Sequence, residues 1–169
     1  MTDKTHEEFK RKLRESDIAV GKVAHYLEEK FGLQVVKSPL SVAPTFDERM
    51  EHSDSGDLWV NFALQPRRVE VKELTTPFTC AKDWKWEPHF IVCSKSSFDQ
   101  ADPKPLMYIL MNPANTHLAI VKTKTHEHWY AEYRIDQTMP KPIRQLFYFC
   151  PLPKVVWHKI DQERFPHEK

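Results

Sequence analysis

The stretch from residue 56 to residue 73 constrains the fold of this chain more than any other. Polar and apolar residues alternate along it in two runs, which are separated by Gln65-Pro66-Arg67. Such a pattern is typical of a β-hairpin with its break at that tripeptide. Side chains alternate between the two faces of a strand, so one face is expected to build core. Its members would be Leu58, Val60, Phe62, Val69 and Val71.

The opposite face of the predicted hairpin collects two carboxylates and an amine, from Asp57, Glu70 and Lys72. Two neighbouring carboxylates repel each other unless a cation or a proton lies between them. A divalent metal such as Mg²⁺ binds through one or two carboxylates and keeps several waters. Lys72 is then placed to orient a metal-bound water or to stabilise a developing anion. The alternative is a solvated face on which Glu70 and Lys72 simply pair.

These residues resemble a known motif. Gly56-Asp57 opening one strand and Glu70-Val71-Lys72 on the next look like the motif of the PD-(D/E)xK nuclease superfamily. The stretch 17–32 is similar to the first helix of Holliday-junction-resolvase-like members, and the strands follow in the same order. Residues 75–99 look like the corresponding segment of small, often phage-encoded members. The resemblance covers roughly residues 15 to 125.

The resemblance implies a restriction-endonuclease-like core and metal-dependent hydrolysis of phosphodiester bonds in DNA, with RNA as an open alternative. It also implies that Asp57, Glu70 and the Val71 carbonyl bind Mg²⁺ or Mn²⁺. The metal polarises the phosphoryl group and lowers the pKa of a bound water. In this scheme Lys72 orients that water or balances charge in the transition state. Resolvase-like members work as dimers, so a homodimer is an expectation too, although the sequence shows no interface.

A long helix is expected over residues 5–31, with a break near Ser16-Asp17 and Asp17 as the N-cap of its second part. Gly32 is expected to end the helix. The apolar residues that follow Asp17 have the spacing of a buried stripe. They are Val20, Val23, Ala24, Leu27 and Phe31.

One position departs from the resembled family. Resolvase-like members carry a glutamate where this chain has Gly21. At about 100° per residue, Asp17, Gly21 and Glu28 lie along one flank of the helix stripe. Either Asp17 or Glu28 therefore replaces the missing glutamate, or the site has no helical carboxylate.

Other residues are candidates for accessory roles. Asp54 could bind the metal through a water or cap a turn, and Ser97 and Asp99 could touch phosphate or cap a short helix that begins near Ser96 or Ser97. The basic residues expected to grip the nucleic-acid backbone are Arg67, Arg68, Lys82 and Lys85. Trp84 and Trp86 alternate with two of these lysines, so they either stack on bases or pack into the core.

Length and composition indicate one globular domain over residues 1–169. The 40% hydrophobic content, with ten Phe and five Trp, is sufficient for a core. Twenty-five basic and 24 acidic residues give a net charge of +1, so nucleic-acid contact would need a local patch. Three widely spaced cysteines match neither a disulfide framework nor a zinc site. No apolar run approaches about 18 residues, so no membrane span is expected and a cytoplasmic location is the default.

The second half of the chain is expected to add strands. Residues 90–93 are predicted to form a buried strand, and residues 106–111 and 117–123 an interior hairpin. The whole is predicted to be an α/β protein with a central mixed β-sheet, one main N-terminal helix and minor helices. The predicted function is a metal-dependent DNA nuclease. The alternatives are a nucleic-acid-binding relative that has lost cleavage and a protein-interaction factor.

Overall fold

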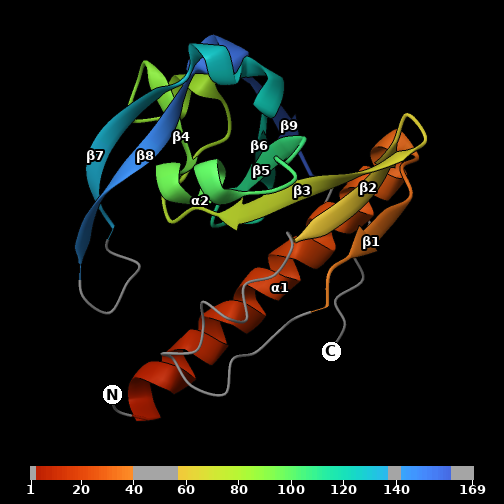
Figure 1. Cartoon of the computed structure of the whole chain (residues 1–169), viewed down its shortest axis with the longest axis horizontal. Helices are drawn as coiled ribbons and strands as arrows, with labels where there is room; N and C mark the ends of the chain where they lie inside the picture. The colour runs from red at the N-terminus through yellow and green to blue at the C-terminus, as the bar shows by residue number, and fades with distance from the viewer. Residues whose placement is uncertain (1–2, 40–56, 137–141, 161–169) are drawn as a thin grey trace. The chain divides into compact units, whose positions relative to one another are not determined.

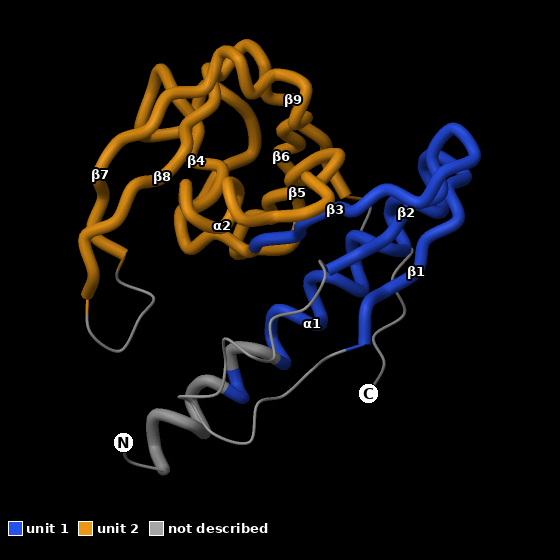
Figure 2. Tube along the Cα trace, viewed as in Figure 1, with its two compact units in different colours: residues 1–72 blue, residues 73–169 orange. Residues whose placement is uncertain are grey.

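The protein has two compact units, residues 1–72 and 73–169 (Figure 2). The computed structural model describes residues 3–39, 57–136 and 142–160 (Figure 1). The α/β class expected from the sequence is confirmed, since multi-stranded sheets are combined with few helices. Each unit is described on its own below.

The first unit consists of a long helix and an antiparallel three-stranded meander. Its elements are α1 (Asp3–Phe31), β1 (Val35–Lys37), β2 (Leu58–Phe62) and β3 (Gln65–Glu73). In the registered pairs, Lys37 lies opposite Leu58, and Leu58 lies opposite Val69. Four apolar strand residues are buried as the alternation predicts, namely Leu58, Val60, Val69 and Val71. Burial of side chains of this size contributes roughly 1.5–3 kcal/mol each.

Helix α1 runs without the break that the sequence suggested near Ser16-Asp17. Residues 3–20 contain neither proline nor glycine, so the backbone hydrogen bonds continue past Asp17. Its carboxylate instead binds the Nζ of Lys37 on β1 at 2.7 Å. Gly32, with φ of +60°, ends the helix as expected.

The buried stripe of α1 differs at its edges from the predicted one. Val20, Val23 and Leu27 are buried as expected, whereas Phe31 at the helix end is exposed. Ala19 and Tyr26 are buried in addition. The helix therefore covers its sheet with a face that is rotated toward residues 19 and 26.

The hairpin between β2 and β3 turns two residues earlier than predicted. Ala63 and Leu64 form the turn with φ of +52° and +64°, and Gln65-Pro66-Arg67 belongs to β3. Phe62 pairs with Gln65, and Asn61 with Pro66. In a two-residue hairpin the second pair from the turn is not hydrogen-bonded, so Pro66 loses no ladder bond. Phe62, expected in the core, lies beside the turn and is 50% exposed.

The turn at Ala63-Leu64 gives a prediction for stability. Replacing Leu64 by glycine is expected to raise the free energy of unfolding by roughly 0.5–1 kcal/mol, because glycine adopts positive φ without a Cβ clash. Leu64 is 96% exposed, so few contacts are lost. Urea denaturation measures the change. Leu64→Ala is the matched control, since it removes the same apolar surface but keeps the Cβ; equal effects of the two substitutions would contradict the backbone explanation.

The second unit contains two three-stranded antiparallel arrangements, β5–β6–β9 and β4–β8–β7. Its strands are β4 (His89–Ser94), β5 (Met107–Met111), β6 (His117–Lys122), β7 (Tyr130–Asp136), β8 (Ile143–Pro151) and β9 (Val155–Lys159). Its helices are α2 (Lys95–Gln100) and the 3-10 helices η2 (Ala81–Asp83), η3 (Thr123–His128) and η4 (Leu152–Lys154). The buried strand and the interior hairpin predicted here are both confirmed.

Aromatic rings fill the core of the second unit. Phe78 lies edge-on to Trp84, Phe90 and Trp157, with ring centroids 5.5–6.0 Å apart. Trp84 is 2% exposed and its Nε1 donates to the His89 carbonyl at 2.9 Å, whereas Trp86 is 46% exposed. The sequence pattern did not distinguish the two tryptophans, but Trp84 lies in the core and Trp86 lies on the surface.

Candidate active site

Asp57 lies at the first bend before β2, and its side chain binds the neighbouring strand. The Val71 N–H of β3 donates to Asp57 Oδ2 at 2.7 Å. An N–H of a strand residue points within the plane of the sheet. The carboxylate therefore lies beside the backbone of β3 at the end of the sheet, rather than standing on the outer face as the alternation predicted.

This hydrogen bond also fixes the direction of the Val71 carbonyl. In an antiparallel ladder the N–H and C=O of one residue point toward the same neighbour. Because the Val71 N–H points toward Asp57, its carbonyl oxygen lies on the same side of β3. The backbone thus presents the Val71 carbonyl next to the Asp57 carboxylate, which is the pair of oxygen donors that the resemblance implies for a metal.

Glu70 lies on β3 between Val71, which bonds to Asp57, and Val69, which belongs to the last registered pair of β2 and β3. The Glu70 side chain is 17% exposed and accepts from the Arg68 Nε at 2.7 Å. Arg68 was expected to grip nucleic acid; here it neutralises one of the two carboxylates.

Lys72 is half-buried and lies on the same face of β3 as Glu70 and Arg68, two residues beyond Glu70. Arg67 alternates with these side chains and is exposed. The structure thus places Asp57 against the backbone of β3 at Val71, and Glu70 and Lys72 lie on either side of Val71 along that strand.

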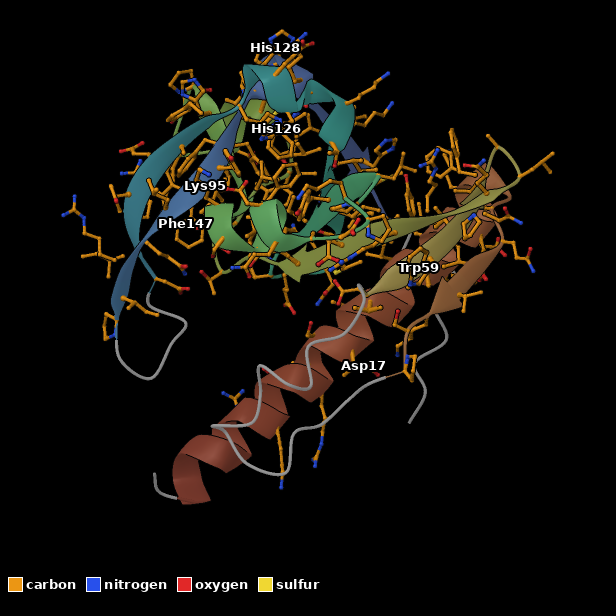
Figure 3. The ribbon with its side chains drawn as sticks, viewed as in Figure 1. Asp17, Trp59, Lys95, His126, His128 and Phe147 are labelled. Atoms are coloured by element: carbon orange, nitrogen blue, oxygen red, sulfur yellow. The ribbon has the colours of Figure 1, made fainter. Side chains whose placement is uncertain are left out.

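Asp17 is a carboxylate of α1 that contacts the neighbouring strand β1 (Figure 3). Lys37 Nζ binds Asp17, and the next residue, Ser38, donates its N–H to the Asp57 carbonyl at 3.1 Å. These two contacts link α1, β1 and the start of β2 at one place. Glu28 is exposed, nearly two turns beyond Gly21 toward the C-terminal end of α1. Asp17 and Glu28 were the two predicted substitutes for the missing glutamate. Of these, Asp17 is the one that binds Lys37, whose neighbour Ser38 bonds to Asp57.

Lys37 and Ser38 are the residues of this region that sequence reasoning missed. Each lies next to a predicted site residue only because β1 pairs with β2 in this register. The three-residue strand gives too weak a pattern to fix that pairing, so no signal in the sequence identified them.

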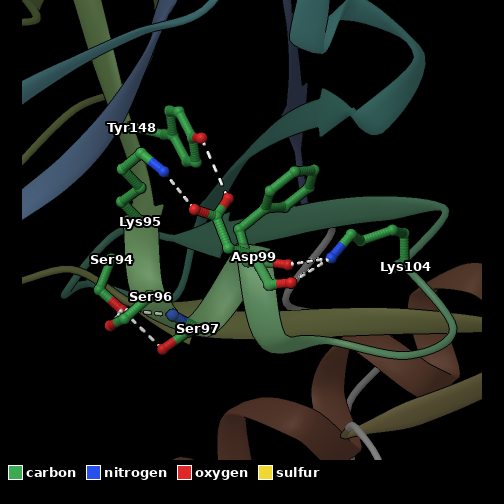
Figure 4. Close-up of polar contacts among 8 residues, drawn as sticks. Ser94, Lys95, Ser96, Ser97, Asp99, Lys104 and Tyr148 are labelled. Atoms are coloured by element: carbon green, nitrogen blue, oxygen red, sulfur yellow. Dashed lines mark hydrogen bonds and ion pairs between the residues drawn. The ribbon is translucent and has the colours of Figure 1, made fainter.

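Ser97 and Asp99 lie in the second unit, where they make local contacts (Figure 4). Ser97 donates its N–H to Ser94 Oγ at 3.2 Å, so Ser94, not Ser96 or Ser97, caps α2. Asp99 pairs with Lys95 and accepts from the Tyr148 hydroxyl at 3.1 Å. The hydrogen bond from Lys95 is the main cause that lowers the pKa of Asp99. Both side chains therefore have structural partners.

The two predicted nucleic-acid-binding lysines of the second unit, Lys82 and Lys85, have different surroundings. Lys82 lies exposed in η2, and Lys85 places its Nζ 4.7 Å from the ring centroid of the exposed Trp86. A cation beside an exposed indole keeps the combination of charge and ring expected for nucleic-acid contact. Asp83, between them, accepts from Thr79 and Cys80. Those bonds outweigh desolvation and lower the pKa of Asp83.

The donor set at the hairpin fits one hard cation held with waters. Across the described part of the chain, no three His, Cys, Asp or Glu side chains are grouped as in an all-protein metal cage. Mg²⁺ needs only one or two carboxylates, and Asp57, Glu70 and the Val71 carbonyl are oxygen donors of the required kind. Asp54, predicted as an accessory residue, lies outside the described residues.

Comparisons of the chain with models of known protein families, with curated proteins and with solved structures find no match. In the described segments, no helix is both long enough and apolar enough to span a bilayer.

Proposed function

We propose that this protein is a metal-dependent nuclease that hydrolyses phosphodiester bonds in DNA, with its centre at Asp57, Glu70 and Lys72. The observation that carries the proposal is the hydrogen bond from the Val71 N–H to Asp57. It holds the Asp57 carboxylate against the backbone of β3, the strand that also carries Glu70 and Lys72. The order of elements, a helix followed by a three-stranded meander, agrees with a restriction-endonuclease-like core.

In this proposal Asp57, Glu70 and the Val71 carbonyl would hold Mg²⁺ or Mn²⁺, which supplies Lewis-acid activation of the phosphate and of a water. The chain's own residues do the rest. Asp57 is oriented by its bond to β3, and Lys72 faces the developing charge on the phosphoryl oxygens. Arg68 is close enough to balance Glu70 and, when phosphate approaches, to donate to it.

The direct test is cleavage of plasmid, linear duplex, single-stranded and branched DNA by the full chain with Mg²⁺ or Mn²⁺. Metal-dependent cutting that EDTA abolishes is the expected result. An RNA substrate in the same series decides between the two nucleic acids. Absence of cutting on every substrate, with both metals, would reject the proposal.

Gly21 offers a second way to probe the site. A Cβ built at Gly21 meets no atom within 4 Å, and Gly21 lies one turn beyond Asp17 on α1. Gly21→Glu is therefore expected to fit and to add a carboxylate, tightening Mn²⁺ binding about tenfold, a typical gain for one more charged ligand worth about 1.4 kcal/mol. Isothermal titration calorimetry measures it.

The matched control is Gly21→Ala. It removes a helix-interior glycine and is expected to stabilise the protein by about 1 kcal/mol without changing Mn²⁺ affinity. If alanine and glutamate change Mn²⁺ affinity equally, the added carboxylate does not reach the proposed metal.

A relative that binds nucleic acid without cutting it is the second candidate. The Arg68–Glu70 ion pair favours it, because both side chains are largely buried and the guanidinium already occupies the position of a cation beside Glu70. Binding of DNA without cleavage and without Mn²⁺ binding would select this function. An interaction factor, the third alternative, gains support from the exposed Trp86; neither DNA binding nor cutting would select it.

A further inference from the structure

Strand β7 is the outer strand of the sheet β4–β8–β7 in the second unit (Figure 1). It pairs with β8 along its whole length, from Tyr130 opposite Phe149 to Asp136 opposite Ile143, without a bulge. Among the described strands, none pairs with its other side. An edge strand of this length presents a row of N–H and C=O groups that another chain can extend.

Apolar side chains stand on this edge. Tyr133 is 53% exposed and Ile135 is 63% exposed, and the two share one face of β7 with Ala131. Proteins usually protect such an edge with proline, lysine or a bulge. β7 reads Tyr-Ala-Glu-Tyr-Arg-Ile-Asp and carries none of these. Its only charges are Glu132, Arg134 and Asp136, which lie on the other face.

We infer that two copies of this chain pair through β7, antiparallel and centred on Tyr133. In that register Tyr133 lies opposite the partner's Tyr133, and Ala131 lies opposite the partner's Ile135. Glu132 lies opposite the partner's Arg134, and the two-fold symmetry repeats this charge pair. The sequence of β7 is therefore complementary to itself, as an isologous interface requires.

Neighbouring registers lack this match. A shift of two residues places either Glu132 opposite the partner's Glu132 or Arg134 opposite the partner's Arg134, and like charges directly opposite are destabilising. A shift of one residue places the apolar face of one strand against the polar face of the other. Among these neighbouring registers, the charges of β7 therefore favour the one centred on Tyr133.

The single chain keeps the same charges paired. Arg134 binds Glu132 through two contacts, at 2.9 Å and 3.1 Å, and its guanidinium lies 5.3 Å from the ring centroid of Phe149. Both side chains are about half exposed. On pairing, each arginine can exchange its own Glu132 for the partner's, so no charge is left alone. The gain is the burial of Tyr133 and Ile135, together with an aromatic pair on the two-fold axis.

Sedimentation velocity on the full chain over a range of concentrations tests the pairing. The wild type is expected to dimerise reversibly. Arg134→Glu places a carboxylate at position 134 opposite the partner's Glu132, and the symmetry repeats this repulsive pair. The variant is therefore expected to weaken the dimer at least about tenfold. The double variant Glu132→Arg with Arg134→Glu restores both opposite-charge pairs and is expected to dimerise as the wild type does.

Leu64→Glu is the control, since it adds a carboxylate at an exposed leucine of the first unit and is expected to leave the dimer unchanged. Circular dichroism and thermal unfolding verify that each variant is folded. A wild type that stays monomeric up to about millimolar concentration, a dimer that tolerates Arg134→Glu, or a charge swap that fails to restore it would overturn the inference.

Discussion

Replacing Lys72 by alanine is expected to lower the rate of metal-dependent DNA cleavage by about a hundredfold to a thousandfold, the cost of removing one group that stabilises charge in the transition state. The fold should persist, because Lys72 is only half-buried and lies near the end of β3. Single-turnover cleavage with saturating Mn²⁺ measures the rate. Mn²⁺ binding is expected to remain within a few-fold of the wild type, since Lys72 supplies no metal ligand.

Lys82→Ala is the control with the same change of charge, at an exposed lysine of the second unit. It is expected to weaken DNA binding slightly and to leave the cleavage rate at saturating DNA unchanged. Equal rates for Lys72→Ala and the wild type would show that the cleavage centre is not on this hairpin.

Replacing Trp84 by alanine is expected to lower the free energy of unfolding by about 3–5 kcal/mol, the usual cost of deleting a buried tryptophan. The indole is 2% exposed and packs against Phe78 and Phe90. Its loss also leaves the His89 carbonyl without its donor. Guanidinium unfolding followed by circular dichroism measures the change.

Trp86→Ala deletes the same side chain two residues away, at a position that is 46% exposed. It is expected to cost less than about 1 kcal/mol, as exposed substitutions generally do. Trp84→Phe separates packing from hydrogen bonding, because it keeps a ring but removes the donor to His89, at an expected cost of about 1 kcal/mol or more. A similar loss in both tryptophan-to-alanine variants would contradict the assignment of Trp84 alone to the core.

The alternation of residue types identified the β2–β3 pairing and its buried face, because burial of Leu58, Val60 and Val69 dominates the energy of the hairpin. It misplaced the turn, since Pro66 signals a break in most contexts. Here Pro66 occupies a strand position at which the pairing with β2 needs no backbone N–H. Ala63 and Leu64 form the turn with positive φ, although they are not the glycine or asparagine residues that usually signal such a turn. Turn position depends on the register of the whole hairpin, which local residue preferences do not contain.

The spacing of residues in the sequence selected the candidate site residues, but it did not predict the contacts that they make. Asp57, Glu70 and Lys72 follow from their spacing, yet the direction of the Asp57 side chain depends on one hydrogen bond to Val71. The contact of Asp17 with Lys37 depends on how α1 packs on β1, and the ion pair of Glu70 with Arg68 replaces the pair with Lys72 that the spacing also allowed. Asp17 and Lys37 are distant in sequence, and Arg68 and Lys72 are both two residues from Glu70. Residue spacing alone therefore could not predict the first contact or decide which basic residue pairs with Glu70.

The bond between Asp57 and Val71 gives one carboxylate two separable properties. Asp57 Oδ2 accepts the hydrogen bond of the Val71 N–H, as a backbone carbonyl of a neighbouring strand would. The side-chain amide oxygen of an asparagine can accept the same bond. An asparagine at position 57 would thus keep the end of the sheet closed while removing its negative charge, whereas an alanine would remove both. A single substitution could therefore remove the negative charge at position 57, on which the proposed metal binding depends, while the hydrogen bond to β3 is kept.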